Sequence, residues 1–160
     1  MEQIIKAYLE TTMFNLYFDT EKYGHKVTLA FFDAIKAGQF EPYTSQYVLG
    51  ELENAPEPKR SDMIGLIDNF GINVLPATDE SARLASVYIE QHEGIPESKE
   101  TDALHISIAT VNHMDICVSC NFRHINKLKT KRMVERVNNE NRYGPLFICR
   151  PEEVIDYDDE

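Results

Sequence analysis

The chain of 160 residues has no long apolar run, few cysteines, and far fewer basic than acidic residues. No stretch approaches the roughly 20 consecutive apolar residues that a transmembrane helix needs. The first residues, Met1–Gln3, are not a basic segment followed by an apolar one, so no secretory signal peptide is expected. Three cysteines, an odd number, indicate a protein of the reducing cytoplasm rather than a disulfide scaffold.

Several motifs of phosphate, redox and metal chemistry are also missing. There is no glycine-rich phosphate loop, and no Asp-x-Asp pair of the haloacid dehalogenase type follows the first apolar run. Cys117 and Cys120 have the C-x-x-C spacing, but the run is predicted as a strand, whose alternation sends them to opposite faces. Because no second Cys/His pair completes a zinc site, we interpret both as core residues.

Apolar runs alternate with helical patterns along the chain, which predicts βαβ units, a parallel sheet and a single domain. The predicted strands cover residues 4–9, 40–44, 73–75, 116–119 and 146–149. The predicted helices cover 27–37, a segment after Ser45, 59–70, 78–91, a segment around Asp102, and the basic region after 123. Residues 15–23 are predicted as a loop. Pro42 predicts that its strand lies near an edge of the sheet.

Four polar residues occur where such a fold would deliver side chains to one place. Glu10 closes the first apolar run, and Glu51 flanks an apolar helix face. Asp102 opens a helix, and Asn121 follows the strand 116–119. Strand ends and helix starts meet at the carboxyl edge of a parallel sheet. Three carboxylates gathered there repel one another unless a divalent cation joins them, so the pattern predicts a magnesium site.

The helix around Asp102 also has a structural explanation. With Thr101 as the predicted cap, Asp102 lies in the first turn, where the helix dipole stabilises an acid by about 0.3–1 kcal/mol. His105 follows three residues later and is therefore on the same face. The pair lies beside an apolar stripe, which favours a position in a crevice over one in open water.

The two glutamates have structural alternatives as well. Glu51 could direct its carboxylate to water, but if it points inward, a buried charge needs a metal or another cation. Glu10 could be a surface acid at the end of a strand. The hydroxyls of Thr11 and Thr12 follow it directly and can bond either a ligand or the carboxylate.

The net charge of −11 would count against a nucleic-acid partner, because phosphate contacts dominate such binding. Residues 123–136, however, carry a net charge of +5, and the remainder carries −16. This basic island could hold a phosphate backbone, although a solvated helix face explains it equally well. The candidate contact residues are Arg123, His124, Lys127, Lys129, Lys131 and Arg132.

In their order and spacing, these segments resemble the PIN domain. The most specific stretches are Tyr8–Asn15 (YLETTMFN) and Thr101–Ile106 (TDALHI), followed by the run SCNFRHI after a strand. The resemblance covers nearly the whole chain and is strongest to small stand-alone bacterial and archaeal PIN proteins, many of them toxins of toxin–antitoxin pairs. It implies a three-layer α/β/α fold with a central parallel sheet of about four to five strands in residues 1–155, then an acidic tail in 156–160.

The resemblance also implies a function. PIN domains are magnesium- or manganese-dependent ribonucleases that hydrolyse phosphodiester bonds with a metal-activated water. The implied metal ligands are Glu10, Glu51 and Asp102, with Asn121 completing the catalytic set and Thr12 and His105 supporting it. The basic island would then bind RNA. An antitoxin protein and a second copy of the chain are the implied partners, in the cytoplasm and without a membrane.

The chain departs from the family at two positions. The family usually has aspartate where this chain has Glu10, and the extra methylene moves the carboxylate by about 1.5 Å. Asn121 stands where many relatives carry a fourth acid. Magnesium tolerates little distortion of its ligand shell. The alternative prediction is therefore a catalytically weak or inactive PIN-like module that binds RNA or a protein partner.

Overall fold

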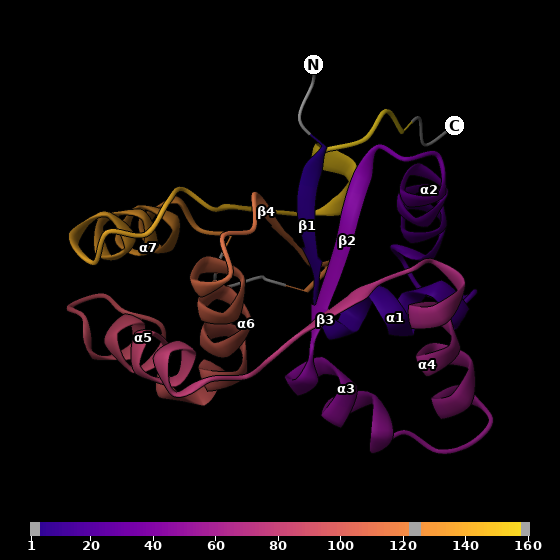
Figure 1. The fold of residues 1–160 in the computed structure, drawn as a ribbon, viewed down its shortest axis with the longest axis horizontal. Helices are drawn as coiled ribbons and strands as arrows, with labels where there is room; N and C mark the ends of the chain where they lie inside the picture. The colour runs from indigo at the N-terminus through magenta and orange to yellow at the C-terminus, as the bar shows by residue number, and fades with distance from the viewer. Residues whose placement is uncertain (1–3, 122–125, 158–160) are drawn as a thin grey trace.

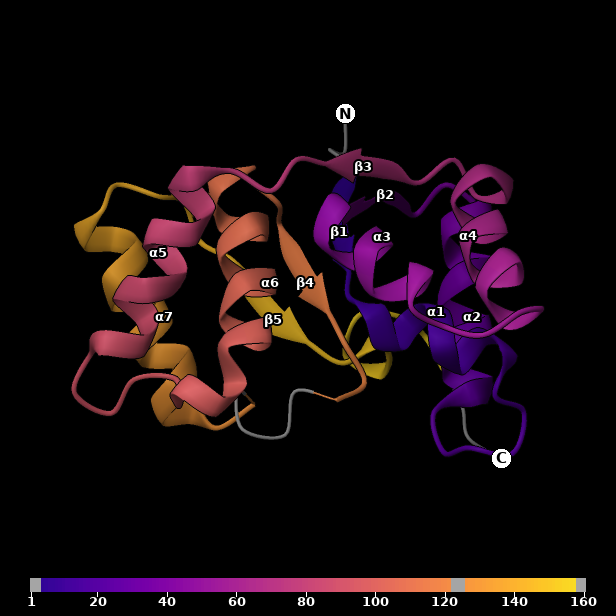
Figure 2. The ribbon, with the colours of Figure 1, turned by 90° about the horizontal axis from the view of Figure 1, so that it is seen from below.

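The computed structural model describes residues 4–121 and 126–157, in which a five-stranded sheet lies between two groups of helices (Figures 1 and 2). The strands are β1 (Ile5–Leu9), β2 (Phe40–Ser45), β3 (Asn73–Leu75), β4 (Ile116–Val118) and β5 (Phe147–Cys149). The helices are α1 (Thr11–Phe18), α2 (His25–Lys36), α3 (Gln46–Glu53), α4 (Lys59–Asn69), α5 (Asp79–Glu90), α6 (Glu100–Val111) and α7 (Leu128–Glu140). Two 3₁₀ turns, η1 (Glu97–Lys99) and η2 (Pro151–Glu153), complete these ranges.

Every neighbouring pair of strands is parallel, and the order across the sheet is β3-β2-β1-β4-β5, which makes the N-terminal strand central. Helices α1, α2 and α4 lie on one side of the sheet, and α5, α6 and α7 lie on the other (Figures 1 and 2). This confirms the predicted three-layer α/β/α fold. No helix in the described ranges is long and apolar enough to span a membrane.

Helix α1 corrects the prediction of a loop over residues 15–23, because the helix continues to Phe18. Glu10 caps it by accepting a hydrogen bond from the Thr12 backbone N–H at 2.7 Å. Met13, Phe14 and Leu16 are its buried residues. Glutamate is not among the residues that usually cap helices, so the sequence carried no recognisable start signal.

Strand β2 lies second from one edge of the sheet, between β1 and the edge strand β3, which agrees with the prediction that Pro42 places its strand near an edge. Pro42 pairs with Ala7 of β1, whereas pairing with β3 begins one residue later, at Tyr43 and Asn73. The Pro42 carbonyl accepts a hydrogen bond from the Asn73 side-chain amide at 3.2 Å. Proline is tolerated here because it lies just outside the ladder with β3.

Helix α6 begins at Glu100, one residue before the predicted cap. Lys99 occupies the N-cap position without a side-chain capping bond, and Thr101 lies inside the first turn. The turn η1 leads directly into the helix, so the chain enters α6 already coiled and needs no threonine cap. Asp102 still lies in the first turn, as predicted.

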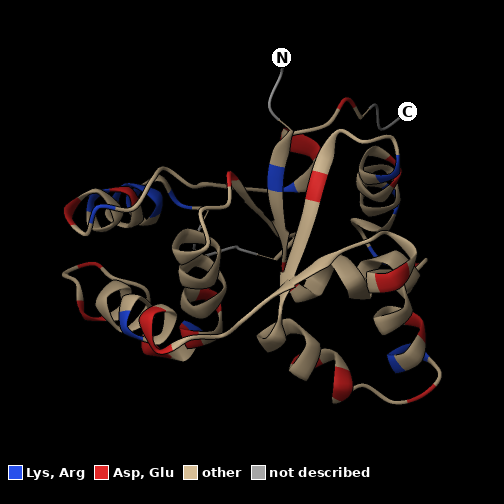
Figure 3. Cartoon of the chain, in the orientation of Figure 1, with Lys and Arg blue, Asp and Glu red and all other residues tan. Residues whose placement is uncertain are grey.

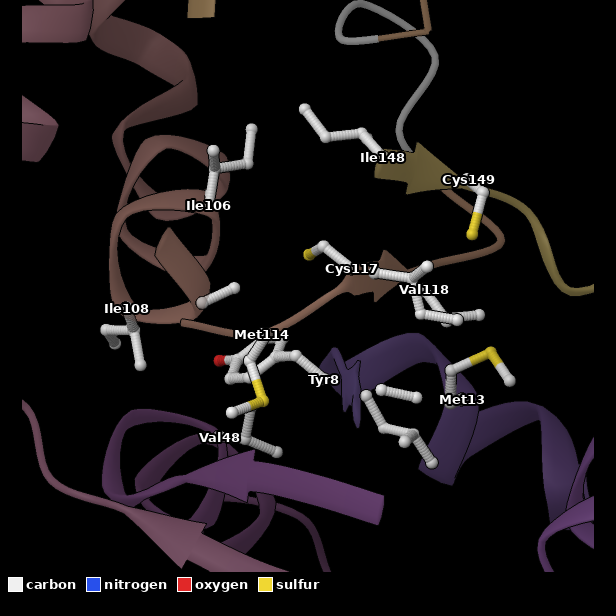
Figure 4. Packing of buried hydrophobic residues seen from close by; sticks show 14 of the residues in the cluster. Tyr8, Met13, Val48, Ile106, Ile108, Met114, Cys117, Val118, Ile148 and Cys149 are labelled. Carbon is white, nitrogen blue, oxygen red and sulfur yellow. The ribbon is translucent and has the colours of Figure 1, made fainter. Parts of the chain in front are cut away.

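The core is continuous around β1 and β4. Tyr8, Cys117 and Val118 are fully buried there, and Val48 and Met114 pack around the Tyr8 ring (Figure 4). The cysteines are free, as predicted for core residues, with Cys117 and Cys149 buried and Cys120 partly buried.

A buried polar group joins the three helices of the α5–α7 layer. The Tyr88 hydroxyl of α5 donates a hydrogen bond to Asn138 Oδ1 of α7 and lies 3.3 Å from Thr110 Oγ1 of α6. Burial raises the pKa of Tyr88. Polar atoms in a core are tolerated when they are paired with each other, as these are.

An ion pair holds the end of α1 to the start of α4 and makes stability depend on pH. Lys59 Nζ lies 2.8 Å from Asp19 Oδ1, and this hydrogen bond lowers the pKa of Asp19. A carboxyl with a lowered folded-state pKa stabilises the fold above its unfolded-state pKa, and the effect is lost as the pH falls through the folded-state value. We expect Asp19→Asn to reduce the free energy of unfolding by about 0.5–1 kcal/mol at neutral pH.

Urea denaturation of both proteins across a pH series measures this difference. The difference in unfolding free energy should shrink as the pH falls below the unfolded-state pKa of Asp19, 3.8, and vanish once Asp19 is protonated in both states. A difference that stays constant down to the acid limit would show that the ion pair is not its source.

Candidate acidic site

The carboxyl edge of the sheet collects polar residues from three adjacent strands. Glu10 follows β1 directly, Ser45 ends β2, and Ser119 follows β4 directly. All three are buried. Helix α6 leads into β4, so its first turn, which carries Asp102, begins at this same edge. The chain thus brings segments from both of its halves to one place.

Glu10 is held by three hydrogen bonds. Its Oε1 accepts from the Thr12 backbone N–H at 2.7 Å, from the Thr12 hydroxyl, and from the Ser119 hydroxyl at 3.0 Å. The side chain is only 6% exposed. The extra methylene of glutamate therefore does not carry the carboxylate into solvent, because the side chain folds back onto the first turn of α1.

Glu51 comes from α3 and is fixed by two donors. Its Oε1 accepts a hydrogen bond from the Thr11 hydroxyl at 2.6 Å and lies 3.1 Å from His105 Nε2. Burial alone would raise the pKa of Glu51, but the hydrogen bonds from His105 and Thr11 outweigh it and lower the pKa. Glu51 is therefore an ionised acceptor at neutral pH. The consecutive residues Thr11 and Thr12 therefore hold both glutamates against the first turn of α1.

Asp102 is partly buried and lies in the same electrostatic neighbourhood. Burial raises the pKa of the Cys117 thiol, and charges that include Glu10 and Asp102 raise it further. Burial also raises the pKa of Tyr47, with Glu51, Glu100 and Asp102 adding to it. Cys117 is thus close to both Glu10 and Asp102, and Tyr47 is close to both Glu51 and Asp102. The three carboxylates form what we call the acidic centre: Glu10, Glu51 and Asp102.

No protein-family model and no curated protein sequence matches this chain. Two solved structures are similar in fold. The first is Mycobacterium tuberculosis VapC20, a toxin that cleaves the sarcin–ricin loop, with a TM-score of 0.56 and 13% identity over 78% of this chain and 98% of VapC20. The second is Rickettsia felis VapBC2 bound to a promoter DNA fragment, with a TM-score of 0.55 and 14% identity over 91% of this chain and 98% of the matched one.

Both neighbours are PIN-domain proteins, and the order and direction of the strands agree with the fold expected from the sequence. The chain has a PIN fold. The PIN fold is what the sequence segments around Glu10 and Asp102 predicted. At these identities the similarity extends to the architecture only.

The PIN fold implies a divalent cation, and carboxylate oxygens are the ligands that Mg²⁺ and Mn²⁺ prefer. In residues 4–121 and 126–157, however, no three Asp, Glu, His or Cys side chains are placed to hold one ion together. The Oε1 atoms of Glu10 and Glu51 already accept protein hydrogen bonds. The donor chemistry fits a hard cation and the arrangement does not, so a cation would have to draw the carboxylates closer together.

Asn121, the remaining predicted member, lies next to the acidic centre. Its backbone N–H donates a hydrogen bond to Ser119 Oγ at 3.0 Å, and its side chain is exposed. Thr12, a predicted supporting residue, contacts both Glu10 and Ser119, with 3.3 Å between the two hydroxyl oxygens. His105, also predicted as supporting, is 1% exposed and contacts Glu51.

Fewer cations of the basic island, residues 123–136, are available to a ligand than its composition indicates. Arg123 and His124 lie outside the described residues. Lys129 Nζ is 3.1 Å from Glu93 Oε1, and Lys131 lies over the ring of Phe147. Acidic segments interrupt the basic ones along α7 (Figure 3). The remaining predicted contacts, Lys127 and Arg132, are exposed.

Two residues that hold the acidic centre, Ser119 and Tyr8, were not predicted as part of it. Ser119 bonds Glu10, and Tyr8 bonds both His105 Nδ1 and Ser45 Oγ, at 2.8 Å each. Their only sequence signals are a serine directly after an apolar strand and a phenolic hydroxyl inside one. Both are ordinary in a core, so contacts between distant segments had to reveal them.

Proposed function

We propose that this chain is a PIN-type ribonuclease whose acidic centre is Glu10, Glu51 and Asp102. The observation that carries the proposal is the pairing of Thr11 with Glu51 and of Thr12 with Glu10. These contacts gather carboxylates from two elements at the carboxyl edge of the sheet, where open α/β folds bind their ligands. The similarity of the fold to VapC20, a toxin that cleaves the sarcin–ricin loop, supports RNA as the substrate class.

The residues around the acidic centre have different roles in the proposed reaction. Thr11, Thr12 and His105 orient the two glutamates, and the N-terminus of α6 stabilises the charge of Asp102. The proposal includes Mg²⁺ or Mn²⁺, which when bound would supply an activated water and stabilise charge on the phosphate.

The proposal extends to partners. The similar fold of VapBC2 supports an antitoxin protein that restrains this chain in the cytoplasm. A homodimer, expected from the family resemblance, belongs to the same proposal. Light scattering of the chain alone tests for the homodimer, and co-purification with a candidate antitoxin tests the other partner.

RNA cleavage by the purified chain tests the function directly. Structured and single-stranded RNAs are incubated with Mg²⁺, Mn²⁺ or EDTA, and with the variant Asp102→Asn. The matched control is Asp79→Asn, which removes an exposed acid from the first turn of α5. We expect metal-dependent cleavage in the wild type and in Asp79→Asn, and its loss in Asp102→Asn. A folded wild-type chain that neither cleaves RNA nor binds Mn²⁺ would overturn the proposal.

A second candidate function is favoured by one observation. The Oε1 atoms of both glutamates already have protein donors, as in a site that has no need of a cation. A module that only binds RNA or a protein would have this structure. It would bind RNA equally well with Asp102→Asn and would show no response to Mn²⁺.

A further inference from the structure

A continuous chain of hydrogen-bonding groups runs from the core to the acidic centre. It begins at the Val48 backbone N–H, which donates to Ser45 Oγ at 3.1 Å. The Tyr8 hydroxyl lies 2.8 Å from Ser45 Oγ and 2.8 Å from His105 Nδ1. The opposite ring nitrogen, His105 Nε2, lies 3.1 Å from Glu51 Oε1.

The directions of these hydrogen bonds follow from Glu51, the last group in the series. An ionised carboxylate only accepts, so His105 Nε2 carries a hydrogen. When the imidazole is neutral, Nδ1 is then an acceptor, and the Tyr8 hydroxyl donates to it. Burial raises the pKa of Tyr8 well above its ordinary value, which keeps this proton on the hydroxyl. The Tyr8 oxygen in turn accepts from Ser45.

Packing leaves this chain of groups little freedom. Tyr8 is 0% exposed, and its ring is enclosed by core residues that include Val48 and Met114 (Figure 4). The His105 ring lies between two tyrosines, with centroids 5.9 Å from Tyr8 and 5.3 Å from Tyr47. A ring held at both nitrogens and on two sides has one orientation, and so does the hydrogen that it presents to Glu51.

We infer that Tyr8 is a positioning residue of the acidic centre, which acts through His105 to fix the orientation of Glu51. This inference rests on the proposed function, since it assigns Tyr8 a part in the same reaction. Tyr8 lies too deep to touch a substrate, so its effect must pass through the imidazole. The distinguishing property is the hydroxyl, because a phenylalanine would fill the same apolar space.

The test compares Tyr8→Phe with Tyr88→Phe. Tyr88 is an equally buried tyrosine, but its hydroxyl bonds Asn138 and Thr110 in the α5–α7 layer and does not contact the acidic centre. In wild-type protein labelled with ¹⁵N at histidine, His105 should show a hydrogen on Nε2 and a hydrogen-bonded Nδ1. Tyr8→Phe should shift the Nδ1 resonance, and Tyr88→Phe should not.

RNA cleavage supplies the second measurement. We expect Tyr8→Phe to lower kcat about 10-fold with little change in KM, because the substrate still binds while Glu51 is held less well. Tyr88→Phe should keep the wild-type kcat even if it lowers Tm by a similar amount. An unchanged kcat in Tyr8→Phe, or an equal loss in both variants, would overturn the positioning role and leave the proposed function standing. A wild-type chain without any cleavage would overturn both.

Discussion

Glu10→Gln is expected to slow RNA cleavage by about 10²–10³-fold while the protein stays folded. Glutamine keeps the Oε1 acceptor that receives the Thr12 N–H and the Ser119 hydroxyl, so the start of α1 is preserved. It removes the negative charge, which the proposed reaction uses. The loss of several kcal/mol of charge stabilisation corresponds to this change in rate. Single-turnover cleavage, with Tm as the check on folding, measures it.

The matched control for this charge removal is Glu53→Gln. Glu53 is an exposed acid two residues after Glu51 on the same helix, and its replacement should leave the cleavage rate unchanged. Full activity of Glu10→Gln would exclude Glu10 from the reaction. Equal losses in both variants would indicate a dependence on net charge rather than on the acidic centre.

The largest effect on stability is expected from Phe32→Ala, at about 3–5 kcal/mol. The Phe32 ring is fully buried where α2 meets α1 and α4. Its centroid lies 5.0 Å from that of Tyr17 and 4.9 Å from that of Phe70, in edge-on geometry, and such pairs add to the burial energy. The substitution leaves a cavity that these neighbours cannot close. Urea denaturation gives the free energy of unfolding.

An exposed aromatic provides the comparison for this result. Tyr23 is 89% exposed, and Tyr23→Ala should change stability by no more than about 0.5 kcal/mol. Phe32→Leu should fall between the two, because leucine refills part of the space. A loss below about 1 kcal/mol in Phe32→Ala would mean that the three helices can repack around the vacancy.

The sequence predicted the layers of the fold but misplaced individual features for identifiable reasons. The alternation of apolar runs and helical patterns was sufficient for the parallel sheet and its five strands. Helix α1 was missed because a glutamate caps it. Pro42 was a usable signal, because its strand is second from the edge of the sheet and the proline lies just beyond the pairing with β3.

For the acidic site, the sequence could supply chemical types and approximate positions but not contacts. Glu10, Glu51 and Asp102 remain predictions as site residues, and the structure adds that the first two are engaged by threonines. The roles of Tyr8 and Ser119 could not be predicted, since their partners are 97 and 109 residues away in the chain. Such pairs depend on the order of the strands, which a single sequence does not contain.

The central position of the N-terminal strand has a consequence during synthesis of the chain. Glu10 leaves the ribosome early, but its partner Ser119 is made 109 residues later, and β4 beside it equally late. At about 5–20 residues per second, that is a delay of roughly 5–20 s. A chain that is proposed to cleave RNA thus lacks its assembled acidic centre while most of its own message is being translated.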